Sequence, residues 1–168
     1  MTPSIKREHF EQQITPTACV IACACMALRA RGHSPDQRAL HVDKSVSGRP
    51  FGDITLLVAG ARPLAGPDLV QSVSLELATE RPVAIEVRGR PWMYLTPVQR
   101  ARTASRSLWI DEGDFLHAVV LYGLEPVDGR LMPEDEFLCL DPFFSASDQP
   151  LRLTAAQLRS VLTRAIAL

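Results

Sequence analysis

Apolar residues in the first half of the chain follow patterns typical of helices. The run Ala18 to Leu28 is apolar on every side, which predicts a buried helix over residues 18–31, with Thr17 as its cap and Gly32 as its stop. Two further helices are predicted at residues 34–41, beginning with Ser34 as cap, and at residues 67–79. The segment between these two helices, residues 44–66, is rich in Gly, Pro and Ser.

The second half changes to short apolar runs typical of strands. Strands are predicted at residues 83–87, 115–124, 137–140 and 151–153, with a hairpin connection over 125–133. A last helix is predicted at 154–166, because Thr154 and Gln157 form a capping box before apolar positions. Helices followed by antiparallel strands predict an α+β fold, in one domain over residues 1–168 with an N-terminal arm at 1–12.

Composition narrows the class of protein. With 168 residues, 46% hydrophobic and 22% charged, the chain suits one globular domain rather than a disordered segment. A net charge of −1 gives no general attraction to nucleic acid. The longest apolar run is too short to cross a bilayer and is a poor signal peptide, so we expect no membrane span.

The four cysteines do not form a disulfide or metal framework. Three of them, Cys19, Cys23 and Cys25, lie within seven residues on one predicted helix, and the fourth is Cys139. Their spacing suits neither a structural disulfide nor a zinc site, so no metal and no cofactor are expected. A reduced chain indicates a cytoplasmic protein, or one exported by a route that needs no signal peptide.

One of these cysteines is a candidate nucleophile. Cys19 lies in the first turn of the predicted helix, where free N–H groups and the helix dipole favour a thiolate. Cys23 and Cys25 lie deeper in the apolar run, which predicts inert thiols.

A base and an orienting acid can be found for Cys19. His117 opens an apolar strand, whereas His33 lies at the opposite end of the cysteine's own helix, about 20 Å away. Asp141 ends the strand that answers His117 across the predicted hairpin, so antiparallel pairing would place the two side by side. Gln13, six residues before Cys19, could donate a hydrogen bond to an oxyanion, although its neighbour Gln12 could exchange roles with it.

Three segments that contain these residues carry a resemblance to a known family. Residues 13–19 (QITPTAC), 117–123 (HAVVLYG) and 140–142 (LDP) resemble papain-like cysteine peptidases, and most closely the bacteriocin-processing peptidases that cleave double-glycine leaders. The resemblance implies a papain-like fold with Cys19 as nucleophile, His117 as base, Asp141 as orienting acid and Gln13 in the oxyanion hole. The family usually has glycine after its cysteine, where this chain has Val20.

The sequence therefore favours a cysteine peptidase that hydrolyses a peptide or isopeptide bond through a thioester and acts on a peptide or protein substrate. An acyltransferase or a glutamine deamidase could use the same residues. A non-catalytic peptide-binding module on a degenerate peptidase fold is a third possibility.

An arginine-rich stretch, residues 88–107, has two interpretations. It contains five arginines and no acidic residue, with aromatic residues between them. It could be a flap that recognises an acidic substrate, but a solvated insertion without selective function is favoured.

Overall fold

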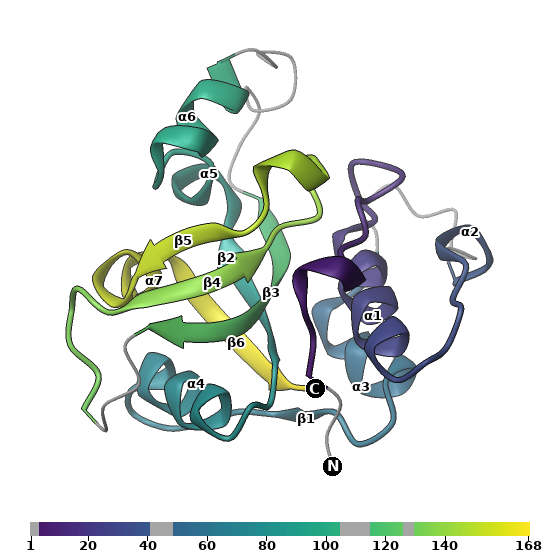
Figure 1. The fold of residues 1–168 in the computed structure, drawn as a ribbon, viewed down its shortest axis with the longest axis horizontal. Helices are drawn as coiled ribbons and strands as arrows, with labels where there is room; N and C mark the ends of the chain where they lie inside the picture. Colours follow the sequence, from purple (N-terminus) through teal and green to yellow (C-terminus); the bar gives the residue numbers. More distant parts are fainter. Residues whose placement is uncertain (1–3, 41–48, 105–114, 126–129) are drawn as a thin grey trace.

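A computed structural model describes residues 4–40, 49–104, 115–125 and 130–168 of the chain. Its centre is a six-stranded antiparallel sheet, in the order β1-β6-β2-β3-β4-β5 (Figure 1). The strands are β1 (Arg62–Pro63), β2 (Val83–Arg88), β3 (Leu116–Glu125), β4 (Glu136–Leu140), β5 (Leu151–Thr154) and β6 (Leu162–Ala167). The predicted α+β fold is confirmed.

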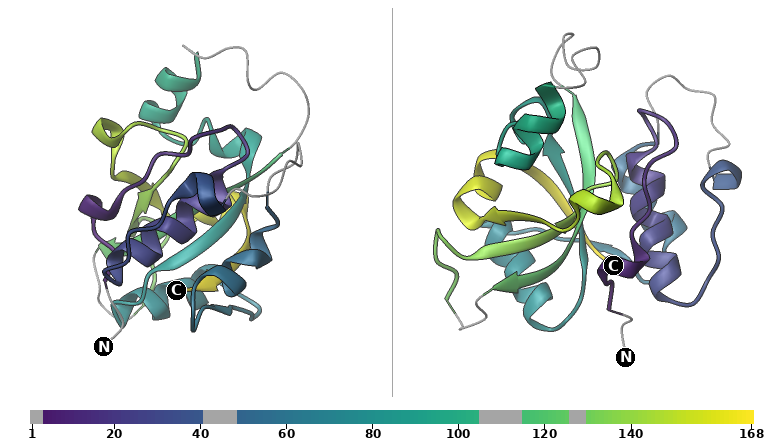
Figure 2. Two further views of the ribbon diagram at one scale, coloured as in Figure 1. Left: turned by 90° about the vertical axis from the view of Figure 1, so that its right-hand side faces the viewer. Right: turned by 45° about the horizontal axis from the view of Figure 1, so that its top comes forward.

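Helices cover both faces of this sheet. On one side lie α1 (Cys19–Ala30), α2 (Gln37–Leu40), α3 (Ile54–Leu57) and the short 3-10 helices η1 (Arg7–His9) and η2 (Phe51–Asp53). On the other side lie α4 (Leu69–Ala78) and α7 (Ala155–Val161), while α5 (Gly89–Trp92) and α6 (Pro97–Ala104) extend beyond one end of the strands (Figures 1 and 2). A third 3-10 helix, η3 (Ala146–Asp148), follows β4.

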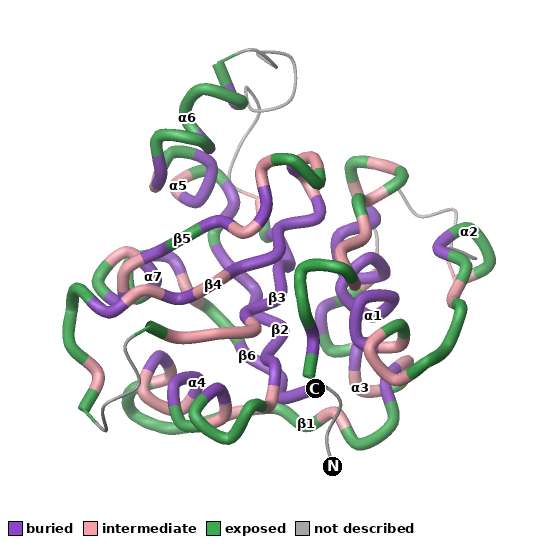
Figure 3. The backbone as a smooth tube through the Cα atoms, in the orientation of Figure 1, coloured by how far each residue is buried: buried purple, intermediate pink, exposed green. Residues whose placement is uncertain are grey.

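Alternation along the strands divides the core into two layers. Ala84, Ala118, Val120 and Ile166 are buried against the α1 side, whereas their strand neighbours pack against α4 and α7. Two of the four residues that face α1 are alanines, whose small side chains let the helix lie close to the sheet. Residues 19–27 of α1 are all buried, so the most apolar segment of the chain is also the most enclosed (Figure 3).

The first predicted helix is confirmed, but not its cap. The helix α1 begins one residue later than expected, with Ala18 at the cap position and no capping side chain. Thr17 does not fill this role. Gly32 ends the helix as predicted, because the backbone there turns to a φ of +82°.

The other helical predictions differ mainly in length. The second helix, α2, begins at Gln37 rather than after Ser34, and the Asp36 carboxylate accepts the Arg38 N–H. The third prediction corresponds to α4, which Asp68 caps by accepting the Gln71 N–H.

The predicted C-terminal helix is half wrong. The capping box of Thr154 and Gln157 starts α7 as expected, but the helix ends at Val161. Residues 162–167 instead form β6, which pairs with both β1 and β2. A strand here satisfies backbone hydrogen bonds on two sides and buries Ala165 and Ile166, an arrangement that a pattern read along the chain does not reveal.

The four predicted strands are confirmed as β2, β3, β4 and β5. Residues 126–129, at the tip of the predicted hairpin, lie outside the described residues. In the described part of the chain, no helix combines the length and the apolar character needed to cross a bilayer.

Candidate active site

Cys19 is the first residue of α1 and its side chain meets the start of β3. The Cys19 thiol interacts with the His117 side chain and with the backbone N–H groups of Val20 and Ala118. Burial alone would raise the pKa of this thiol, but the hydrogen bond and charge of His117, together with the two N–H donors, lower it below its ordinary value. The structure therefore favours a thiolate at this position.

His117 reaches Cys19 because β4 stops short of it. The pairing of β3 with β4 ends at Val120 and Leu140. The first residues of β3 therefore face the α1 side with no part of β4 between them and the helix. The imidazole Nε2 lies 2.7 Å from Asp141 Oδ1, which leaves Nδ1 for the cysteine sulfur. Burial lowers the pKa of His117, but Asp141 and Cys19 outweigh it and raise the pKa to about 10. A charged imidazolium is thus stabilised beside the thiolate.

Asp141 follows the last residue of β4 and is completely buried. Its carboxylate accepts three hydrogen bonds: from His117, from Trp92 Nε1 at 2.7 Å and from the Phe143 N–H at 2.9 Å. The Asp141 backbone N–H donates to Gln149 Oε1, and its carbonyl accepts from Gln149 Nε2. The carboxylate is therefore fixed in position and has little freedom to turn away from the imidazole.

Gln13 lies beside Asp141, but its side-chain amide donates to nearby backbone carbonyls rather than pointing to Cys19. Its Nε2 donates to the carbonyl oxygens of Thr15 at 2.9 Å and Pro16 at 3.0 Å, which hold the turn leading into α1. Its Oε1 is buried without a hydrogen-bond partner among the described residues. The Gln13 backbone N–H donates to the Pro142 carbonyl, next to Asp141. The structure thus brings the backbone of Gln13 to the site while its side-chain donors point to local carbonyls.

Three buried side chains that support the site were not predicted from the sequence: Trp92, Gln37 and Gln149, which holds the Asp141 backbone. Trp92 belongs to the arginine-rich stretch, where a Trp-Met pair among charged residues was the available signal of local burial. Gln37 holds the segment around Gln13: its Oε1 accepts the Ile14 N–H, and its Nε2 donates to the Gln12 carbonyl and to Glu11 Oε1. No sequence signal distinguished Gln37 from any other glutamine at the start of a helix.

The remaining cysteines have the opposite chemistry. All four cysteines are free and buried. Burial raises the pKa of Cys23 and Cys139 well above the ordinary value and raises that of Cys25 to about 12, so these thiols are neutral. Within the described ranges, no cluster of three or more His, Cys, Asp or Glu side chains could hold a metal ion.

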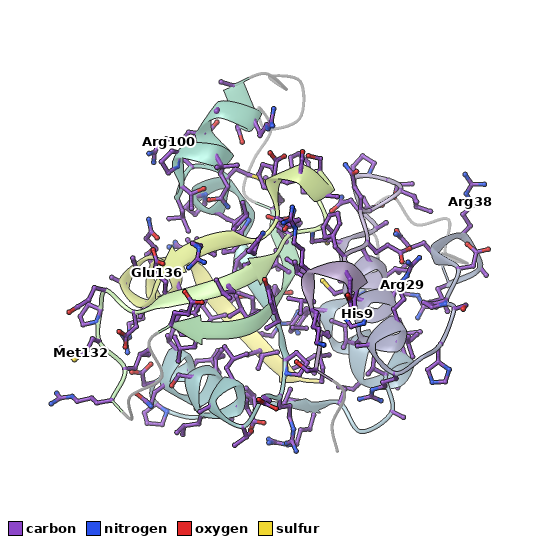
Figure 4. The ribbon with its side chains drawn as sticks, viewed as in Figure 1. His9, Arg29, Arg38, Arg100, Met132 and Glu136 are labelled. Atoms are coloured by element: carbon purple, nitrogen blue, oxygen red, sulfur yellow. The ribbon has the colours of Figure 1, made fainter. Side chains whose placement is uncertain are left out.

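Among the described histidines, His117 alone is one of the groups that change the pKa of the Cys19 thiol. His9 is on the N-terminal arm in front of α1, and its Nδ1 accepts the Lys6 N–H (Figure 4). His33 is exposed just after α1. His41 falls outside the described residues.

The arginine-rich stretch is not simply a solvated insertion. Trp92 and Met93 are buried in the core, and Arg100 donates to the Tyr94 carbonyl within the same segment. Arg102 forms an ion pair with Asp148 at 2.8 Å. Arg100 lies on α6, far from α1 in the view of Figure 4. Trp92 also contacts Asp141 directly, so part of this stretch belongs to the core. That its arginines have no selective function stays a prediction, and Arg106 lies outside the described residues.

Comparison with known proteins supports the architecture. No family model matches the sequence, and no curated protein matches it. A crystal structure from Bacillus anthracis, provisionally described as a C39-like peptidase, superposes with a TM-score of 0.54 over 98% of this chain and 96% of that one. The chain shares the fold of that structure. Sequence identity is 17%, so the likeness extends to the fold alone.

Proposed function

We propose that this protein is a cysteine peptidase that hydrolyses peptide bonds through Cys19, His117 and Asp141. The observation that carries the proposal is that His117, held by Asp141 at 2.7 Å, interacts with Cys19 so that the pKa of the thiol is lowered and that of the imidazole is raised. Such a thiolate and imidazolium pair supplies a nucleophile and a proton donor in one contact. The C39-like peptidase fold supports the same conclusion.

In the proposed reaction, the Cys19 thiolate attacks the carbonyl carbon of the substrate. The N–H of Cys19 holds the developing oxyanion, together with Gln13 if its amide turns from the Thr15 or Pro16 carbonyl. As the tetrahedral intermediate collapses, His117 gives its proton to the leaving amine, and a thioester remains on Cys19. Water, deprotonated by the now neutral His117, attacks the thioester and releases the carboxylic acid and the Cys19 thiolate, which restores the pair of thiolate and imidazolium.

Asp141 acts in this scheme by orienting the imidazole. Its bond to Nε2 directs Nδ1 to the cysteine, and its negative charge stabilises the imidazolium. The contact between Cys19 and His117 favours a catalytic protein over a peptide-binding module on a degenerate fold, in which the two groups have no need to meet.

The test is cleavage of a defined peptide panel by the purified protein, read by intact mass, together with the Cys19→Ala variant. The panel includes a peptide with Gly-Gly before the scissile bond, the substrate class implied by the sequence resemblance. We expect cleavage by the native chain and none by the variant. Cleavage that survives in Cys19→Ala, or no cleavage of any peptide, would overturn the proposal.

Intact mass also separates the related reactions. Hydrolysis divides the peptide, deamidation of a glutamine adds about 1 Da, and transfer adds the mass of the acceptor amine. A product of the second or third kind without hydrolysis would assign the same thiol to a deamidase or an acyltransferase instead. Loss of that product in Cys19→Ala would still locate the chemistry at this site.

A further inference from the structure

A charged pair, Glu86 and Arg164, lies in the sheet on the side of β3 away from Asp141. The strand registers place Ala118 opposite Glu86, and Glu86 opposite Arg164, so the three form one row across β3, β2 and β6. Ala118 packs in the same buried cluster as Cys19, and its N–H interacts with the Cys19 thiol. The adjacent row, Val120-Ala84-Ile166, is buried in the core that packs against α1. The row that contains the charged pair is therefore the next one along the same face, and its Ala118 is the member that adjoins the nucleophile.

The row beyond it is open to solvent. Leu116 and Arg88 pair in the next register, and both are exposed. Glu86 itself is buried, whereas the Arg164 side chain is 54% exposed. The exposed guanidinium therefore lies between a closed core and a solvent edge, in the same row as the residue whose N–H interacts with the thiol.

The arginine is held in one orientation. Arg164 Nε donates to Glu86 Oε1 at 2.8 Å, and a terminal nitrogen donates to Oε2 at 2.6 Å. Thr163 Oγ1 donates to the same Oε1 at 2.8 Å. The Phe51 ring lies 5.3 Å from the guanidinium carbon and comes from η2, on the α1 side of the molecule. These contacts fix the guanidinium in one orientation. Most of the conformational entropy of the Arg164 side chain is therefore lost before any ligand binds.

The unused donors define the ligand chemistry. Both carboxylate oxygens of Glu86 accept hydrogen bonds and the residue is buried, so the group that the pair presents to solvent is the guanidinium. The second terminal nitrogen of Arg164 has no partner among the described residues and carries two N–H groups. Planar N–H donors on a cation match a carboxylate best.

We propose that Arg164, oriented by Glu86 and Phe51, is a specificity-determining residue that receives an acidic side chain of the substrate near the scissile bond. This inference rests on the proposed peptidase function. Neighbouring strands lie about 4.8 Å apart, so Arg164 is about 10 Å from Ala118 across the sheet. An extended peptide covers that distance in about three residues, which places the acidic side chain within three positions of the cleaved bond.

The experiment uses pairs of peptides that differ only by Glu or Gln, with the substitution moved through three positions on each side of the scissile bond. For the native chain, we expect kcat/KM to be about 10-fold higher with Glu than with Gln at one of these positions, as for a charge-assisted hydrogen bond. In Arg164→Gln, this preference should fall to about 2-fold or less, while cleavage of the Gln peptides changes little. In Arg164→Lys, which keeps the charge but loses the planar fork, an intermediate preference is expected.

The matched control is Arg152→Gln. Arg152 has a similar exposed fraction, 49%, and is paired with Glu125 and Glu136, but it lies on β5 at the opposite edge of the sheet. It should keep the full preference for Glu, and so should any correctly folded variant distant from Cys19. Far-ultraviolet circular dichroism and the labelling rate of Cys19 by iodoacetamide report whether Arg164→Gln remains folded. If that variant is misfolded, Arg164→Lys provides the comparison.

The outcomes separate this inference from the function on which it rests. Equal cleavage of Glu and Gln peptides by the native chain overturns the acidic subsite and leaves the peptidase in place. A preference for Glu that survives in both Arg164→Gln and Arg164→Lys overturns the role of Arg164 alone. No cleavage of any peptide overturns the proposed function and the inference with it.

Discussion

Cys19 and Cys23 lie one turn apart on the same helix, yet their sulfur atoms have opposite chemistry. Both are in the core between α1 and the sheet, and burial raises the pKa of both thiols. For Cys19 this effect is outweighed by His117 and by the N–H groups of Val20 and Ala118. For Cys23 it is reinforced by the negative charges of Cys19 and Asp141. The difference lies in hydrogen-bond partners rather than in burial.

The comparison also shows what positions a reactive thiol. The helix terminus provides only the Val20 N–H, whereas His117 and the Ala118 N–H come from β3. These β3 groups face the cysteine because β4 pairs no further than Val120. The end of β4, three residues short of His117, is thus as important for the reactivity of the Cys19 sulfur as the start of α1.

Removal of the His117 imidazole should make Cys19 a largely neutral thiol, as Cys23 is. In His117→Ala, the hydrogen bond and the positive charge are lost while burial remains, so the pKa of Cys19 should rise to its ordinary value or above. A thiol of ordinary pKa is only a few per cent ionised at pH 7. We therefore expect alkylation of Cys19 by iodoacetamide at pH 7 to slow by at least about 10-fold, and peptide cleavage to be lost.

The labelled residue is identified by peptide mapping, and Cys23→Ala provides the control. That variant should keep the native labelling rate, because Cys23 is neutral and fully buried. In the native chain, labelling should stay rapid across neutral pH, because the thiolate is stabilised above the lowered pKa of Cys19 and the imidazolium persists until its own pKa of about 10. Equal labelling of the native chain and His117→Ala at pH 7 would contradict the account given for the sulfur.

Much of this arrangement could be predicted from the sequence, because its signals are local. The apolar run at 18–28, the histidine at the start of a strand and the aspartate at the end of the next strand each have a position along the chain that implies a position in space. Antiparallel pairing of β3 and β4 then brings His117 and Asp141 together. The fold class follows from the same order of helices and strands.

What the sequence missed depends on contacts between distant segments. Trp92 donates to Asp141 across 49 positions, and β6 becomes a strand only because β2 and β1 lie on either side of it. The register that joins Ala118, Glu86 and Arg164 is likewise a property of three paired strands. Such contacts have no periodicity along the chain, so propensity and pattern do not reveal them.

Gln13 offers a way to separate activation of the thiol from stabilisation of the oxyanion. If its amide turns to the oxyanion, Gln13→Ala should lower kcat by about 100-fold, the loss typical of one missing donor. The alkylation rate of Cys19 should change by less than about 3-fold, because Gln13 is not among the groups that lower the pKa of the thiol. The measurements are steady-state cleavage and iodoacetamide labelling on the same preparations.

The neighbouring glutamine is the matched control for this prediction. Gln12 is exposed, and its backbone carbonyl rather than its side chain is used by Gln37. Gln12→Ala should therefore retain nearly native kcat. If kcat and the labelling rate fall together in Gln13→Ala, the side chain serves only to hold the Thr15 and Pro16 carbonyls before α1.

The smallest expected effect comes from Trp92, which lies one contact further from the sulfur. In Trp92→Phe, Asp141 loses the donor on Oδ2 but keeps the Phe143 N–H and its backbone bonds with Gln149. A buried charge that loses a hydrogen bond costs about 2 kcal/mol of folding free energy, measured by urea unfolding. Since the carboxylate charge is less stabilised, it should hold the His117 proton more strongly, and the alkaline limb of activity should move to higher pH.

Met93→Leu, in the adjacent buried position, is the packing control: it should alter stability without moving that limb. A pH profile in Trp92→Phe identical to the native one would mean that Trp92 contributes packing alone and does not act on the imidazole through Asp141.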